Sequence, residues 1–434
     1  MKIRQTPEVH IEGYKEMSIN GKTLEYLNPK SIFLPTNFPS ELNVLVKAGD
    51  HVKIGDVLMT QEGRFGHPFL SPIAGTVKGT VRKWYPTNRM LPMLEIENDF
   101  SEEVVDTFKN LDPDQMTREE LIELMKSSGL VGMGGAGFPT FAKYQTDKEV
   151  DSVIINLAEC EPFITCDYTY SLNYPNELIY GLKYFIKTAN AKSGIIALKD
   201  KEINKKLIDV LKPLLEENMT IFLLKDVYPA GWERYVVEKV TLKQYNMLPI
   251  EAGVIVNNAT TAITFGRLLK EGLPPSVKYL TITGDAMNEC GNVMLKFGTD
   301  VHEVLPLFSD VKEDINKEEC LMICGGPMTG NAMFSGDFVS SPTLGSVIAL
   351  VCNSNGKRFP HCLGCGTCAK HCPVHLSPYE IKRTLRTGDV DELINLGINK
   401  CIQCGQCSYV CPSHVELTSD MLIARDLVRK MKVK

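Results

Sequence analysis

Short apolar stretches separated by Gly and Pro turns make up the first hundred residues of the chain. These stretches cover residues 32–34, 44–46, 57–59, 76–77 and 94–96. Runs of this length between turn residues are typical of β-strands. We therefore expect residues 1–105 to form an all-β domain.

A different rhythm follows, in which strand-length apolar runs alternate with amphipathic runs of helix length. The predicted strands are 153–157, 194–198, 220–224 and 253–257, and the predicted helices are 177–189, 201–215, 233–242 and 260–269. This alternation favours a parallel, doubly wound sheet, in which ligands bind beyond the carboxyl ends of the strands. Residues 106–272 are expected to form this α/β domain, after a first helix capped by Thr117 and Glu120.

The rest of the chain divides into two smaller parts. Residues 273–350 return to short apolar runs and predict a small α+β domain. Residues 351–434 combine two cysteine-rich runs with helical patterns at 377–386 and 416–434. The fold class predicted from the sequence is therefore multidomain, with an all-β start, an α/β centre, a small mixed domain and a helical end.

Two turns in the first part are informative. Residues 44–56 predict a strand, a turn and a strand, with Gly49 and Gly55 at the turns, and residues 71–77 predict a second tight turn into a strand. The pair resembles the barrel-sandwich fold of biotinyl and lipoyl carrier domains, in which a lysine at a hairpin tip holds the cofactor. The intervening residues 61–67 contain no lysine. We expect the barrel-sandwich fold without the carrier function.

Two cysteine runs, at 362–373 and 401–412, share the spacing C-x2-C-x2-C-x3-C-P. This spacing is that of bacterial two-cluster ferredoxins, in which the fourth cysteine of each run ligates the other cluster. Three closely spaced thiolates can reach one [4Fe–4S] cube, and the partner run supplies the fourth. The predicted ligands are Cys362, Cys365, Cys368 and Cys411 for one cluster and Cys401, Cys404, Cys407 and Cys372 for the other.

Other uses of these cysteines are less consistent with the spacing. Zinc sites usually combine two C-x2-C pairs or mix Cys with His, and disulfides need an oxidising compartment. The six remaining cysteines of the fourteen follow no framework spacing, which fits a reduced setting. We interpret the four histidines beside the runs as neighbours of the clusters and not as ligands.

A glycine-rich segment at 129–140 contains a formal G-x-G-x-x-G at Gly132, Gly134 and Gly137. A Rossmann site would place this motif between a buried strand and a helix. Here it follows an amphipathic helix, and Pro139 disfavours a helix interior directly after it. We interpret it as a loop whose bare amides approach an anion or a flat ring, with Lys143 adding positive charge.

The same segments, taken together, resemble a known family. The glycine loop with Lys143, the segment 156–162 (NLAECEP) and the pair Asn257-Asn258 resemble the flavin-binding subunit of complex I. With the barrel-sandwich start and the double cysteine run, their order is similar to that of the RnfC subunits of Rnf electron-transport complexes over nearly the whole chain.

The resemblance implies FMN, an adjacent NADH site, two [4Fe–4S] clusters and partner subunits that exchange electrons with them. It also implies that residues 273–350 form a soluble-ligand-binding β-grasp domain. Glu159 and Glu161 would line the nicotinamide side as catalytic residues. The implied cofactor-binding residues are Gly132, Gly134, Gly135, Gly137, Lys143, Asn156, Tyr228, Glu233, Asn257, Asn258 and Thr260.

The chain departs from the family at Trp232, where a second glycine usually follows Gly231. An indole is large enough to fill part of a flavin or NADH pocket. Three functions therefore stay open. The chain oxidises NADH through FMN for a membrane ferredoxin:NAD+ oxidoreductase, feeds a soluble amino-acid or corrinoid reductase, or is a flavin-less iron–sulfur adaptor.

Charge and hydropathy narrow the setting. The net charge of −6 gives no argument for nucleic-acid binding. No apolar run reaches the roughly 18 residues of a membrane span, and the first residues lack the apolar core of a signal peptide. We expect a cytoplasmic protein held at the inner face of the cell membrane by its partners.

Overall fold

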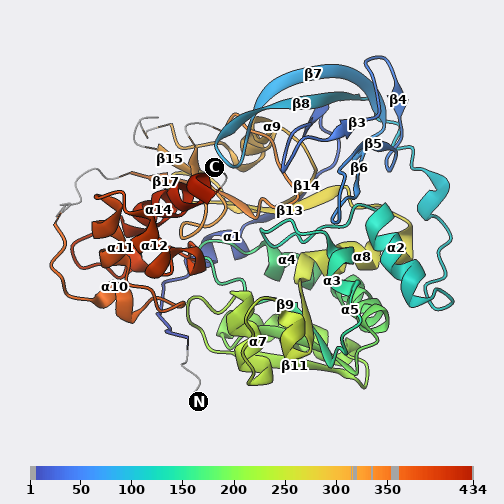
Figure 1. The fold of residues 1–434 in the computed structure, drawn as a ribbon. Coiled ribbons are helices and arrows are strands. Elements are labelled where there is room, and N and C mark those ends of the chain that lie inside the picture. The colour runs from blue at the N-terminus through green and yellow to red at the C-terminus, as the bar shows by residue number, and fades with distance from the viewer. Residues whose placement is uncertain (1–5, 314, 316–319, 334–335, 353–360, 433–434) are drawn as a thin grey trace.

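The computed structural model describes residues 6–432 except 314, 316–319, 334–335 and 353–360. Figure 1 shows three tiers, with the barrel at the top, a mixed sheet in the middle and the α/β domain at the bottom, and the C-terminal helices at one side. The fold class predicted from the sequence is confirmed. The four domain boundaries stay predictions.

The first all-β part is a sandwich of two small sheets. One sheet has the order β2-β8-β7-β4 and the other β3-β5-β6. Buried side chains such as Leu58, Ile73 and Val77 fill the space between them. The strands are β2 (Ser31–Pro35), β3 (Asn43–Val44), β4 (His51–Val52), β5 (Val57–Thr60), β6 (Pro68–Leu70), β7 (Gly75–Tyr85) and β8 (Arg89–Asn98).

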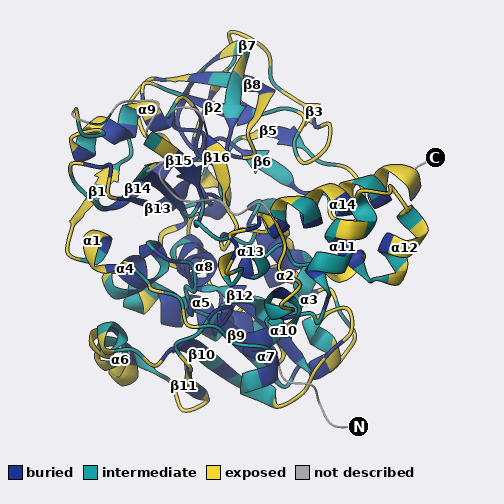
Figure 2. Ribbon diagram, turned by 90° about the vertical axis from the view of Figure 1, so that its left-hand side faces the viewer, coloured by how far each residue is buried: buried dark blue, intermediate teal, exposed yellow. Residues whose placement is uncertain are grey.

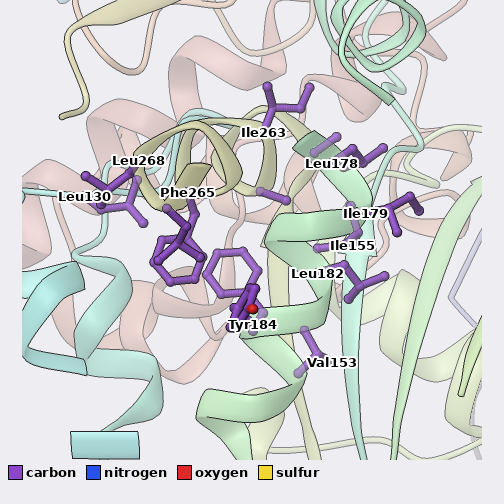
Figure 3. Packing of buried hydrophobic residues seen from close by; sticks show 14 of the residues in the cluster. Leu130, Val153, Ile155, Leu178, Ile179, Leu182, Tyr184, Ile263, Phe265 and Leu268 are labelled. Carbon is purple, nitrogen blue, oxygen red and sulfur yellow. The ribbon is translucent and has the colours of Figure 1, made fainter. Parts of the chain in front are cut away.

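The central sheet is parallel, with the order β11-β10-β9-β12. Its strands are β9 (Ser152–Asn156), β10 (Ser193–Lys199), β11 (Met219–Leu224) and β12 (Val254–Asn258), and its helices are α4 (Cys166–Asn173), α5 (Pro175–Ala189), α6 (Lys205–Leu211), α7 (Glu233–Thr241) and α8 (Ala259–Glu271). Val153 and Ile155 face the core under α5 and α8, while Ile154 faces the core under α7. Strands buried on both faces explain the continuous apolar runs. Figure 3 shows the α5–α8 side of this packing.

The middle tier is a six-stranded mixed sheet with the order β1-β14-β13-β17-β15-β16. Its strands are β1 (Lys22–Tyr26), β13 (Val277–Thr283), β14 (Gly291–Lys296), β15 (Cys320–Cys324), β16 (Asn331–Met333) and β17 (Ser346–Val351), and α9 (Val301–Val304) packs nearby. Strand β1 pairs in parallel with β14, so residues 22–26 lie outside the barrel. The segment before β1 contains α1 (Glu16–Ile19).

The C-terminal part consists of short helices around the cysteine loops. They are α10 (Thr367–Lys370), α11 (Pro378–Leu385), α12 (Val390–Asn395), α13 (Gln406–Tyr409) and α14 (Leu417–Lys432). Ile381, Leu393 and Val428 are fully buried where α11, α12 and α14 meet. Figure 2 shows exposed residues along α14 and α12, on the side that points away from the other tiers.

Candidate redox site

The glycine segment is a loop between α2 (Arg118–Ser127) and α3 (Thr140–Tyr144). It closes on itself, because the Gly132 N–H donates to Phe138 O at 2.8 Å and the Gly137 N–H donates to Gly132 O at 3.2 Å. Gly135 and Gly137 have φ of +122° and +63°, values that side chains rarely adopt. The structure thus has the predicted loop, with no helix following directly from the motif.

Two other elements hold the loop in place. The Met133 N–H donates to Thr261 Oγ1 at 2.9 Å, and Lys278 Nζ donates to Met133 O at 2.7 Å. A Cβ on Gly134 would lie 2.9 Å from the Asn258 side chain. Only glycine therefore lets the loop lie directly over the start of α8.

Asn258 caps α8 and links it to α4. Its Oδ1 accepts from the Thr260 N–H at 2.9 Å and from Thr260 Oγ1 at 2.6 Å, and its Nδ2 donates to Asp167 Oδ2 at 2.6 Å. Asn257 donates to the Tyr144 hydroxyl at 2.7 Å, but its buried Oδ1 has no partner among the described residues. An unmet acceptor at the end of a parallel strand fits a site that binds a donor from a ligand.

Lys143 is buried at the same edge of the sheet. Its Nζ donates to Val256 O at 2.6 Å. Burial lowers the pKa of Lys143, and the charge of Glu233 opposes that shift. Glu233 in turn accepts from the Tyr245 hydroxyl at 3.0 Å. The ammonium therefore lies below the strand end, and whether it reaches a flavin phosphate stays a prediction.

A buried ionic cluster, defined as Lys15, Glu159, Asp167 and Lys278, lies beside the loop. Glu159 Oε1 accepts from the Asp167 N–H at 2.8 Å, and Lys15 Nζ is 3.6 Å from Glu159 Oε2. Burial raises the pKa of both Glu159 and Asp167, while Lys15 and Lys278 oppose the rise. The two ammonium groups balance the two carboxylates in a place from which water is largely excluded.

Of this cluster, only Glu159 could be identified from the sequence. Asp167 belongs to α4, a helix that no sequence pattern predicts. Lys15 comes from the segment before β1, where no local pattern indicates a partner 144 positions away; its contact becomes visible only in the folded chain. Lys278 is a polar position in a strand, yet it is buried.

Glu161 faces the small mixed domain. Its carboxylate accepts from the Met328 N–H at 3.1 Å and from Thr329 Oγ1 at 2.5 Å. A Cβ on Gly326 would lie 2.1 Å from Glu161 Cδ, so the turn approaches closely. Burial raises the pKa of Glu161. The predicted catalytic pair is thus divided, with Glu159 in the ionic cluster and Glu161 at a domain junction.

The segment around Trp232 lies across the end of β9. Asn156 Nδ2 donates to Gly231 O at 2.8 Å, and a Cβ on Gly231 would lie 2.8 Å from Cys160 Sγ. The indole of Trp232 packs against the core beneath α7. This contact occupies the indole with core packing.

The eight cysteines of the two runs surround two separate hollows. The first hollow is lined by Cys362, Cys365, Cys368 and Cys411, and the second by Cys372, Cys401, Cys404 and Cys407. The grouping is the interleaved one that the spacing predicts. Backbone N–H groups of Gly364, Gln403 and Val415 donate to cysteine sulfurs at 3.4 Å, a contact that tunes cluster potentials.

The two hollows differ in exposure. Cys362 and Cys365 in the first hollow are exposed. In the second, burial raises the pKa of the Cys404 thiol to about 12 and that of Cys407 to about 11. The amide of Gln406, between these two cysteines, is fully buried without a partner among the described residues. An unpaired amide here fits a bound group that accepts hydrogen bonds, as cluster sulfur does.

The second hollow is joined to the other domains. The Tyr228 hydroxyl donates to Cys404 O at 2.7 Å. A Cβ on Gly405 would lie 2.5 Å from Met328 O, and Met328 is the residue whose N–H binds Glu161. Three domains therefore meet at the Cys404 loop, which we call the cluster junction.

Three family models match the chain in the predicted order. "RnfC Barrel sandwich hybrid domain" matches residues 6–101, "Nuo51 FMN-binding domain" matches 125–266 and "4Fe-4S dicluster domain" matches 356–413. The RnfC-type subunit of the proton-translocating ferredoxin:NAD(+) oxidoreductase complex of Clostridium ljungdahlii is 28% identical over 85% of this chain and 82% of its own length. This chain is RnfC-like. The predicted FMN and two [4Fe–4S] clusters are confirmed as its cofactors.

Other relatives of this RnfC-like chain differ in length and in name. The corresponding subunit of the ion-translocating oxidoreductase complex of Vibrio cholerae is 30% identical over 82% of the chain, which spans 46% of that protein. The cobalamin reductase PduS of Salmonella typhimurium is 31% identical over 61% of the chain and 60% of its own length. A solved NAD+-reducing [NiFe]-hydrogenase chain shares the fold at a TM-score of 0.50 and 15% identity, over 75% of this chain and 64% of that one.

Proposed function

We propose that this RnfC-like chain transfers electrons between NAD(H) and partner subunits of a membrane ferredoxin:NAD+ oxidoreductase. FMN, when bound, exchanges a hydride with the nicotinamide and single electrons with iron–sulfur clusters. The observation that supports this most strongly is the cluster junction, where Tyr228 of the α/β domain contacts the loop of Cys404 at 2.7 Å. That contact brings one cluster site directly against the domain that matches the FMN-binding family.

The residues around the glycine loop would bind and orient the cofactor. Gly134 and Gly135 expose backbone amides over α8, and Asn257 offers a buried acceptor. The ionic cluster keeps Glu159 in a fixed position beside the loop. Glu161 holds the turn at Met328 and thereby fixes the cluster junction. In this scheme the roles of Glu159 and Glu161 are positioning and charge balance.

The order of the two clusters follows from exposure. The buried hollow of Cys372, Cys401, Cys404 and Cys407 adjoins the α/β domain, and the other hollow has exposed cysteines. We propose that electrons pass through the buried site before they reach the exposed one, and that a partner subunit docks there. None of the described helices has the length and apolarity required to cross a lipid bilayer. Attachment to the inner face of the membrane would come through the partners.

A soluble reductase partner is the second candidate, supported by the match to cobalamin reductase PduS over 61% of the chain. Purification of the chain with its partners from cell extract separates the two. Membrane subunits in the complex support the first candidate, and a soluble reductase supports the second.

The test of the flavin function uses anaerobically purified full-length protein. Iron, sulfide and acid-released FMN are measured, and NADH is then added. We expect bleaching of the flavin absorbance, followed by reduction of an artificial dye. Gly134→Ala should lose FMN and retain iron, because its Cβ would meet Asn258 at 2.9 Å. Gly345→Ala is the control, since its Cβ would meet only Ile164 at 3.9 Å.

Two results would contradict the proposal. Protein that contains iron and sulfide but binds no added FMN would favour the adaptor alternative, with Trp232 in the pocket. Protein that binds FMN but shows no bleaching with NADH or NADPH would exclude the nicotinamide as electron donor.

A further inference from the structure

A cavity of about 160 Å³ lies where the barrel, α8 and the six-stranded sheet meet. In Figure 1 this is the region between α8 and strands β13 and β14. It is separate from the glycine loop and from both cysteine hollows. Its polar lining comes from all three parts of the molecule: Glu102, Thr264, Arg267, Ser276, Tyr279 and Lys296.

Lys296 is the unusual member of this lining. The residue is 8% exposed, and its ammonium makes no hydrogen bond or ion pair with any residue that the structure describes. Glu102 attracts it and Arg267 repels it, both through space. Burial of an ammonium group without a partner costs several kcal/mol, on the order of the cost of burying any unpaired charge.

Two further donors face the same space. The Tyr279 hydroxyl is buried beside the Arg267 guanidinium, and its proton has no acceptor among the described residues. Arg267 uses its Nε for Glu271 at 3.1 Å, and its Nη1 lies 3.6 Å from the sulfur of Met294, a weak acceptor. The lining therefore presents an ammonium, a guanidinium and a hydroxyl with few acceptors.

The acidic groups nearby do not satisfy these donors. Glu271 already pairs with Arg267. Glu102 is exposed and forms no ion pair with Lys296 within the described part of the chain. Water would complete the hydrogen bonds but would leave the charge of Lys296 unbalanced.

We propose that this cavity binds a small oxyanion, a phosphate or a carboxylate compound, through Lys296, Arg267 and Tyr279. An oxyanion supplies only acceptors and a negative charge, which is what the lining lacks. Such a ligand would contact the end of the barrel, α8 and the sheet at once. Its binding would therefore stabilise the association of three domains.

The test uses the full-length holoprotein saturated with FMN, so that the glycine loop is already occupied. Inorganic phosphate and succinate are titrated separately in a buffer without other oxyanions, by calorimetry and by thermal unfolding. We expect saturable binding of one of them and a rise in Tm. Lys296→Met should weaken binding at least about tenfold, the loss typical of one charge-assisted contact.

Controls separate this site from general effects of salt. Lys78→Met changes an exposed lysine in the barrel, paired with Glu97 at 2.9 Å, and should leave binding unchanged. Tyr279→Phe removes only a hydroxyl, and should weaken binding severalfold if Lys296→Met fails to fold. Preference for phosphate or succinate identifies the ligand class. Absence of saturable binding, or equal binding by wild type and both site variants, would overturn the proposal.

Discussion

At the scale of single residues, the ionic cluster shows how a buried site keeps its charges. Glu159 and Asp167 would repel each other if both were ionised without counter-charges. Lys15 and Lys278 supply these charges from the chain's beginning and from the middle sheet. The carboxylates still have raised pKa values, because desolvation outweighs the attraction. The cluster therefore depends on pH.

We predict that Glu159→Gln alters the pH dependence of stability. The folded pKa of Glu159 is raised above its ordinary value of 4.5, so the unfolded chain loses this proton first as pH rises. The contribution of Glu159 to stability is complete below 4.5 and is lost between 4.5 and the raised value. In that window the variant should gain on wild type by up to about 1.4 kcal/mol per pH unit.

Thermal unfolding at several pH values measures this difference. Glu123→Gln makes the same substitution on the exposed face of α2 and serves as the control. A constant difference between wild type and Glu159→Gln from about pH 5 to pH 7 would contradict a raised pKa.

At the scale of elements, the contact between α5 and α8 is the closest helix pairing in the α/β domain. A Cβ on Gly181 would lie 2.0 Å from Ala262 O, and one on Gly266 would lie 2.1 Å from Glu177 O. Two glycines thus let the helix backbones touch. Because α8 begins at Asn258 and Thr260, this contact also sets the position of the candidate flavin site.

We predict that Gly181→Ala destabilises the protein, although alanine is the better helix former. Helix propensity favours alanine by up to about 1 kcal/mol. Overpacking costs about 1–3 kcal/mol and requires the helices to separate. The midpoint of thermal unfolding should fall, and FMN should be released more easily. Asn176→Ala, at an exposed position of the same helix, should leave both unchanged.

The elements themselves could be predicted from local pattern. The strand predicted at 253–257 is β12 at Val254–Asn258, and the helix predicted at 233–242 is α7 at Glu233–Thr241. Continuous apolar runs and caps are local signals, and they survive folding. The pairing of β1 with β14 and the contact of Lys15 with Glu159 join segments far apart in the chain. No periodicity records such pairs, so they could not be predicted.

At the scale of the whole molecule, the two hollows form a series from the α/β domain to the surface. The cysteine grouping follows from the spacing alone, because the fourth position of each run has to serve the other cube. Which cube adjoins the α/β domain could not be predicted, since it depends on the contacts of Tyr228 and Met328 with the loop at 404–405.

We predict that Cys411→Ala and Cys404→Ala disrupt different clusters. Cys411 belongs to the second run in sequence but lines the first hollow, whereas Cys404 lines the second. After NADH addition, Cys411→Ala should retain the EPR signal of the inner cluster. Cys404→Ala should lose that signal, and its outer cluster should be reduced by dithionite but not by NADH.

Cys352→Ala, outside both runs, is the control and should behave as wild type. If the Cys404 and Cys411 variants lost the same EPR signal, the ligands would not be interleaved. If NADH reduced the outer cluster of Cys404→Ala normally, the proposed order would be wrong.

The barrel enters and leaves the rest of the protein at a single point. The Asn98 N–H donates to Lys30 O at 2.9 Å, and Asn98 Nδ2 donates to Pro29 O at 2.9 Å. Residues 30–98 therefore form a closed insert, like a cassette clipped between β1 and α2. A two- or three-residue bridge could replace it without stretching the remaining backbone, and gene rearrangements could add or remove it as one piece.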